Sequence, residues 1–96
     1  MSREEILKTA SKAVNGDRDK RYGKPEDNFQ RIANYWSAYL EEKIDSNDVA
    51  IMMILFKVAR LQSNLQSNNG ADLDSWVDIA GYAACGGEIG TEHEAD

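Results

Sequence analysis

The chain has 96 residues, which suits a single domain, and its 42% hydrophobic and 29% charged residues exclude a disordered, low-hydrophobicity chain. Its net charge of −6 excludes the broadly cationic surface on which non-specific nucleic-acid binding depends. We therefore expect a folded domain that makes no direct contact with nucleic acid.

The first predicted helix begins at Ser2, where Ser2 and Glu5 form the S-x-x-E pattern of a capping box. Asn15 and Gly16 are a natural stop for this helix. Its apolar residues fall on one face: Ile6, Ala10, Ala13 and Val14.

A polar connection over residues 16–25 follows and is the most cation-rich part of the chain. A basic, glycine-containing loop that runs into a helix N-terminus can receive an anion. The other interpretation is a solvated loop with incidental charges, since loops are generally polar. The candidate ligand-binding residues in this connection are Arg18, Lys20, Arg21, Tyr22 and Lys24.

Pro25 opens the second predicted helix, because its missing N–H costs nothing in the first turn. An apolar stripe faces a core and comprises Phe29, Ile32, Ala33, Trp36 and Leu40. Tyr35 and Tyr39 stand on a second face, where they could stack on a nucleotide base.

The third predicted helix is capped by Asp45 or Ser46. Residues 49–56 are apolar all round, which is typical of a helix that is buried on every side. Three neighbouring helices in so short a chain can hardly cover it, so we expect a homo-oligomer with this helix near the interface. The polar residues 63–70 predict a loop.

The fourth predicted helix starts near Asp72. Its expected core stripe is Leu73, Trp76, Val77, Ala80 and Ala84, beside a second stripe of Asp74, Asp78, Gly81 and Cys85. Small residues over 81–87 allow a close approach of another backbone. No strand pattern competes, so the fold class is all-α: a compact four-helix arrangement completed by oligomerisation, with one domain over 1–88 and an acidic flexible tail over 89–96.

Four charged residues lie within the two most apolar helices: Lys57, Arg60, Asp74 and Asp78. We expect them to meet in space. One interpretation is an ion-pair network, because buried charges are ordinarily paired. The other is a ligand site, with the cations on a phosphate and the carboxylates on a divalent metal or a polar group.

Other chemistry finds little support in the sequence. Cys85 has no histidine partner in its segment, and no Gly-rich phosphate loop, zinc spacing or serine triad motif is present. A lone cysteine fits a reducing compartment, and neither a signal peptide nor a membrane-length apolar run is visible. We expect a cytoplasmic protein with no membrane partner and no catalytic residues.

Three strings, RYGKPEDNFQRIANYWSAYL, DVAIMMILFKVARL and DSWVDIAGYAACGGEI, resemble a family of unknown function that is common in phage and prophage genomes. The resemblance covers residues 4–89 and implies a phage origin and a small helical protein. More distantly, the chain is similar to the all-α nucleotide pyrophosphatases of the MazG type, which hold Mg²⁺ with E-E-x-x-E and E-x-x-D motifs. Asp74 and Asp78 would stand for the second motif with one extra residue between them, and Lys57 and Arg60 replace the first.

Three hypotheses of function follow. The first is a phage accessory protein that binds a nucleotide or nucleotide-derived signal without a cofactor and sequesters it to counter host defence. The second is a Mg²⁺-dependent, MazG-like pyrophosphatase. The third is a protein-binding inhibitor of a host defence factor. The shortage of carboxylates near Asp74 and Asp78 favours binding over hydrolysis.

Overall fold

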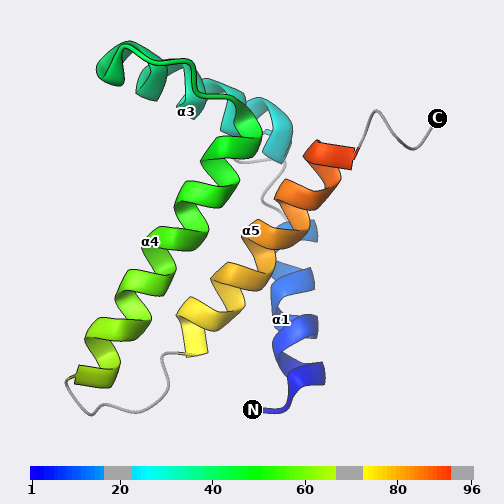
Figure 1. Cartoon of the computed structure of the whole chain (residues 1–96). Helices are drawn as coiled ribbons and strands as arrows, with labels where there is room; N and C mark the ends of the chain where they lie inside the picture. Colours follow the sequence, from blue (N-terminus) through cyan, green and yellow to red (C-terminus); the bar gives the residue numbers. More distant parts are fainter. Residues whose placement is uncertain (17–22, 67–72, 92–96) are drawn as a thin grey trace.

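The computed structural model describes residues 1–16, 23–66 and 73–91, and within these ranges all regular structure is helical. The helices are α1 (Arg3–Asn15), α3 (Pro25–Leu40), α4 (Ser46–Gln66) and α5 (Leu73–Thr91) (Figure 1). The prediction of an all-α chain with four helices is thus confirmed for the described residues. In these ranges no helix has both the length and the apolar character needed to cross a membrane.

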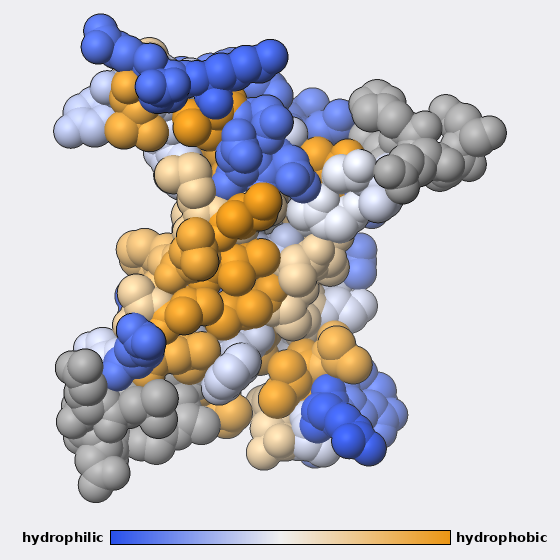
Figure 2. Space-filling model, viewed as in Figure 1, coloured by the Kyte–Doolittle hydropathy of each residue, from blue (hydrophilic) through white to orange (hydrophobic). Residues whose placement is uncertain are grey.

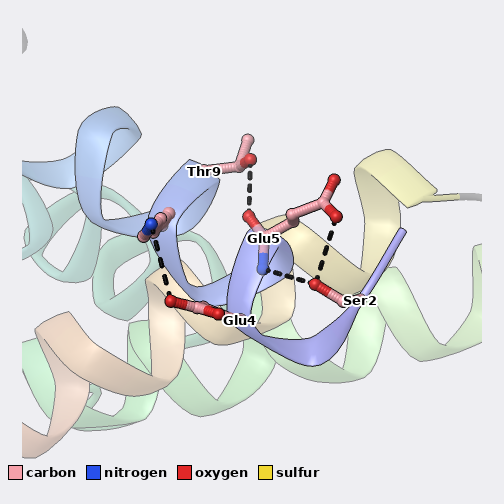
Figure 3. Close-up of polar contacts among 5 residues, drawn as sticks. Ser2, Glu4, Glu5 and Thr9 are labelled. Carbon is pink, nitrogen blue, oxygen red and sulfur yellow. Dashed lines mark hydrogen bonds and ion pairs between the residues drawn. The ribbon is translucent and has the colours of Figure 1, made fainter.

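Ser2 caps the start of α1 as the sequence predicts, and the Glu5 side chain meets the Ser2 hydroxyl rather than its backbone N–H (Figure 3). The Glu5 backbone N–H donates to Ser2 Oγ at 3.1 Å, and Ser2 Oγ donates to Glu5 Oε1 at 3.2 Å. Lys8 Nζ lies 3.5 Å from Glu4 Oε1 on the exposed side of the same helix. The bond to Ser2 Oγ satisfies the Glu5 backbone N–H, which the first helical turn leaves without an intrahelical partner.

The connection between α3 and α4 is fastened by side chains. Ser37 Oγ accepts from the Ile44 backbone N–H at 2.9 Å and donates to the Ile44 carbonyl at 3.1 Å. Asp45 and Asp48 accept from each other's backbone N–H groups, at 2.8 and 3.0 Å, so Asp45 acts as the predicted cap of α4. This short connection holds α3 across the first turns of α4.

Helices α4 and α5 run antiparallel and share the largest contact, α1 lies along α5, and α3 crosses the end where α4 begins (Figure 1). The core lies where α3, α4 and α5 meet. Its buried members are Phe29, Ala33, Val49, Ala50 and Cys85. No contact between α1 and α4 is present in the described residues, so the four helices do not form a closed bundle. The radius of gyration, 14.6 Å, exceeds the about 12.5 Å of a compact domain of this length. A single chain is therefore more open than the compact arrangement expected from the sequence.

The buried face of α5 differs from the predicted stripe. Its buried residues are Ser75, Val77, Gly81, Cys85 and Gly86, whereas Leu73, Trp76 and Ala84 are exposed. The reason is that α5 packs between α4 and α1, and its small residues allow both neighbours to approach. Leu40 of α3, also predicted for the core, is exposed because the last turn of α3 extends beyond α4 and α5.

Two helices are longer than predicted. Helix α4 continues to Gln66, through part of the 63–70 segment that was expected to be a loop. Residues 61–66 contain no glycine or proline, so their polarity alone does not end the helix. Helix α5 continues to Thr91, three residues past the expected boundary at 88, and residues 92–96 of the predicted tail lie outside the described ranges.

Candidate functional site

A groove runs between α1 and α5 and is closed at one end by the start of α3. Three adjoining hollows make up this groove, and Val14 of α1 lines all of them. The central hollow has a volume of about 50 Å³ and lies next to the core. It is lined by Ala13, Val14, Phe29, Val77, Asp78, Gly81, Tyr82 and Cys85.

The central hollow combines an aromatic wall with one carboxylate. The rings of Phe29 and Tyr82 are tilted by 39°, with centroids 6.1 Å apart. Asp78 lies one helical turn before Tyr82 on α5, so both side chains reach the same hollow. The edge of a flat, partly apolar group that carries an N–H donor would suit a hollow of this size.

Asp78 also faces α4. Its Oδ2 lies 3.0 Å from Lys57 Nζ, with 42% of the Asp78 side chain and 17% of the Lys57 side chain exposed. The Lys57 ammonium group is also 5.7 Å from the centroid of the Phe56 ring. One of the expected ion pairs across α4 and α5 is therefore present, and it fixes the Asp78 carboxylate at the edge of the central hollow.

The other two members of the expected network do not join it. Arg60 and Asp74 are both exposed, and neither forms an ion pair within the described residues. Arg60 follows Lys57 by three residues on α4, and its side chain is exposed to solvent. Asp74 lies in the first turn of α5, one turn away from the point where Lys57 meets Asp78.

The largest hollow, about 280 Å³, lies at the junction of α1, α3 and α5. It is lined by Val14, Asn15, Pro25, Ala84, Cys85 and Glu88. Pro25 is the first residue of α3, and Lys24 before it makes no side-chain capping bond. The positive end of the α3 dipole thus lies at this hollow. The third hollow, about 170 Å³, continues along the surface between Leu7 and Ala80.

The residues that the sequence singled out are only partly gathered here. Lys24 directly precedes Pro25, which lines the largest hollow. Four other candidates lie outside the described residues: Arg18, Lys20, Arg21 and Tyr22. In sequence, residues 17–22 join Gly16 to Gly23, between the two helix ends that border this hollow.

Tyr35 and Tyr39 line none of the three hollows. They are 73% and 87% exposed on the outer turns of α3, because this helix crosses α4 and extends beyond it (Figure 1). Phe29 and Asn15 were not predicted as site residues, since the first matches a core stripe and the second a helix stop. Tyr82 follows Asp78 by one helical turn, so the sequence predicts that the two side chains share one face of α5.

In the part of the chain that the structure describes, no group of three or more histidine, cysteine, aspartate or glutamate residues is placed to hold a metal ion.

The ion pair between Lys57 and Asp78 has a testable effect on stability. We expect Lys57→Met and Asp78→Asn each to lower the free energy of unfolding by about 1–2 kcal/mol, less than a fully buried pair because Asp78 remains partly in water. A double-mutant cycle from urea denaturation measures the coupling, which we expect to be about 0.5–1 kcal/mol. Arg60→Met is the control, and an equal loss in this variant would contradict the pairing.

The amino-acid sequence has relatives among phage proteins. The chain is 45% identical over 82 residues to Gene 55 protein of Mycobacterium phage D29, covering 85% of this chain and 51% of that protein. It is 46% identical over 79 residues to Gene 55 protein of Mycobacterium phage L5, covering 81% of this chain and 47% of that protein. The chain therefore spans about half the length of the curated relatives it matches.

No solved structure matches the chain. The phage character implied by the sequence resemblance is supported by the two mycobacteriophage relatives, whereas the similarity to MazG-type pyrophosphatases stays a prediction. A family model described as Domain of unknown function (DUF6378) matches residues 5–90, and the chain belongs to that family.

Proposed function

We propose that this protein is a phage accessory protein that binds a phosphate-containing nucleotide or nucleotide-derived signal in the groove between α1 and α5. The proposal rests on one observation: the central and the largest hollow adjoin each other and differ in chemical character. One is a pocket with aromatic rings and a carboxylate, and the other is a wider hollow at the positive end of α3. A nucleotide has the same division, with a flat base at one end and an anion at the other.

In this proposal one edge of the base enters the central hollow beside the Tyr82 ring, with the buried Phe29 ring behind it. Asp78 accepts a hydrogen bond from an exocyclic amine, and its ion pair with Lys57 holds the carboxylate in position. The phosphate lies at the start of α3, where the helix dipole and Lys24 favour an anion. Residues 17–22 lie outside the described ranges, and we expect their cations, Arg21 among them, to add charge for the phosphate.

Binding without cleavage is the form of the proposal that the ion pair supports. Asp78 is neutralised by Lys57 at 3.0 Å, whereas a Mg²⁺-dependent pyrophosphatase needs several carboxylates directed at the metal. A phage protein that holds a nucleotide signal without consuming it would sequester that signal from the host. Host defence by such signals is the setting that we propose for this role.

Calorimetry with a panel of nucleotides and cyclic nucleotide signals, in EDTA and in Mg²⁺, tests the proposal. We expect binding that survives EDTA. Arg21→Ala and Lys24→Ala should each weaken it roughly 10- to 100-fold, the effect of losing a charge-assisted bond to phosphate. Lys43→Ala is the matched control, since Lys43 is an exposed cation between α3 and α4, away from the groove. The nucleotide affinity of the Lys43→Ala variant should equal that of the native chain.

Two outcomes of this experiment would overturn the proposal. Release of pyrophosphate that depends on Mg²⁺ would favour the hydrolase. An equal loss of affinity in Lys43→Ala would show that binding is a general charge effect rather than a property of the groove.

A protein-binding inhibitor is the second candidate, and one observation favours it. Tyr35, Tyr39 and Leu40 are exposed together on α3, next to Glu41 and Glu42. Exposed tyrosines are enriched at energetically important positions of protein interfaces, and flanking acids would select a cationic partner. If the nucleotide panel shows no binding, this candidate predicts a host protein that the native chain retains and that the double variant Tyr35→Ala/Tyr39→Ala releases.

A further inference from the structure

Helix α4 presents an apolar face that no other described helix covers. The large residues of this face are between 36% and 61% exposed: Ile51, Met52, Leu55, Phe56 and Val58. Figure 2 shows the hydrophobic surface as a continuous patch along α4 that reaches α5. Exposed apolar patches of this kind mark interaction sites.

The size of the uncovered surface suits a second chain. The accessible surface is 7210 Å², about 1700 Å² more than the roughly 5500 Å² of a compact monomer of this mass. A stable interface removes about 800 Å² from each partner. The surplus belongs to the chain as a whole, and the exposed large residues of α4 contribute to it.

The charges on this face favour a second copy of the same chain. A net charge of −6 makes two copies repel over most of their surface, but the α4 face is almost free of charge. Lys57 lies beside this face, mostly buried, and is paired with Asp78 of α5. Two copies can therefore approach through this face with the least repulsion.

The ends of the face also specify an orientation. Asp48 lies in the first turn of α4, at the start of this face. A parallel pair brings the two Asp48 carboxylates together, whereas an antiparallel pair holds them at opposite ends of the interface. An antiparallel pair about a two-fold axis is also the self-complementary contact that closes a dimer.

We propose that two copies of this chain form a dimer through the exposed face of α4, with the two α4 helices antiparallel and crossing near Leu55. The α1–α5 groove lies away from this face and stays open in the dimer. The dimer is thus independent of nucleotide binding, and either proposal can fail without the other.

Light scattering and sedimentation at micromolar concentration test the dimer itself. We expect a dimer for the native chain and at least 100-fold weaker association for Leu55→Glu. Lys43→Glu, which places a new carboxylate away from the face, is the control and should remain dimeric.

Disulfide cross-linking tests the orientation in a chain that otherwise keeps the native face. Leu55→Cys should cross-link to itself on oxidation, because this position lies at the two-fold axis. Gln62→Cys, near the end of α4, should not, because the antiparallel arrangement carries it to the far end of the partner. The native chain, with its buried Cys85, gives the background.

A monomeric native chain would overturn the proposal, as would a Leu55→Glu variant that remains dimeric. Efficient cross-linking of Gln62→Cys with none for Leu55→Cys would overturn the antiparallel arrangement. If Leu55→Glu loses its helical circular dichroism signal, the two cysteine variants still decide the question, because neither introduces a charge.

Discussion

Phe29→Ala is expected to lower the free energy of unfolding by about 3–5 kcal/mol. Phe29 is 3% exposed and lies in the middle of the core, against Ala33 and Val49. Its removal leaves a cavity that small neighbours cannot fill, and it also removes the ring contact with Tyr82. In a chain of this length such a loss should lower the melting temperature by more than about 10 °C.

Urea denaturation followed by circular dichroism measures this loss, at one fixed protein concentration because dimerisation would add to stability. Tyr35→Ala is the matched control, since it removes another large aromatic side chain from the same helix. Tyr35 is mostly in water, so we expect a change within about 0.5 kcal/mol. Similar losses in the two variants would mean that α3 does not turn Phe29 toward α4 and α5.

The helices themselves were predictable because their signals are local. Ser2 and Glu5 at the start of α1 lie within one helical turn of each other, and the proline at the start of α3 acts on its own helical turn. Such local signals do not depend on tertiary packing, so they can be recognised from the sequence alone. The end of α4 was missed because polar residues in 63–66 are compatible with either a helix or a loop.

The packing of α5 could not be read from its sequence. This helix has two stripes of suitable residues, and helical periodicity shows only which residues share a face. Which stripe is buried depends on the helices that pack against α5. The close approach of α4 and α1 buries the stripe with Gly81, Cys85 and Gly86. Trp76 is left exposed at the other end of the helix as a consequence.

The candidate site could be predicted only in part from the sequence. Lys57 and Asp78 could be paired because a charge inside an apolar helix needs a partner. Arg60 has the same sequence signal, yet the rotation of α4 places it in solvent. The groove lies between helices that are distant in the sequence, so no local sequence motif predicts it.

The contact between α4 and α5 depends on one glycine. A Cβ atom at Gly86 would lie 2.8 Å from the Ala50 Cβ, and the Gly86 carbonyl accepts from Asn47 Nδ2 at 3.1 Å. Gly86→Ala must therefore move α4 away from α5 and strain that hydrogen bond. Overpacking of this kind costs about 1–3 kcal/mol, more than alanine gains over glycine within a helix. We expect a net loss of about 1–2 kcal/mol in the free energy of unfolding.

Gly87 provides the control, because it is the next residue of the same helix and a Cβ atom there meets nothing within 4 Å. Gly87→Ala should stabilise the chain by up to about 1 kcal/mol, since it keeps the helical gain without the clash. Neighbouring glycines are thus expected to give opposite signs in the same urea experiment. Adding Ala50→Gly to Gly86→Ala should recover part of the loss, because it removes the atom that the new Cβ meets. Stabilisation by Gly86→Ala would show instead that α4 and α5 lie further apart than this packing requires.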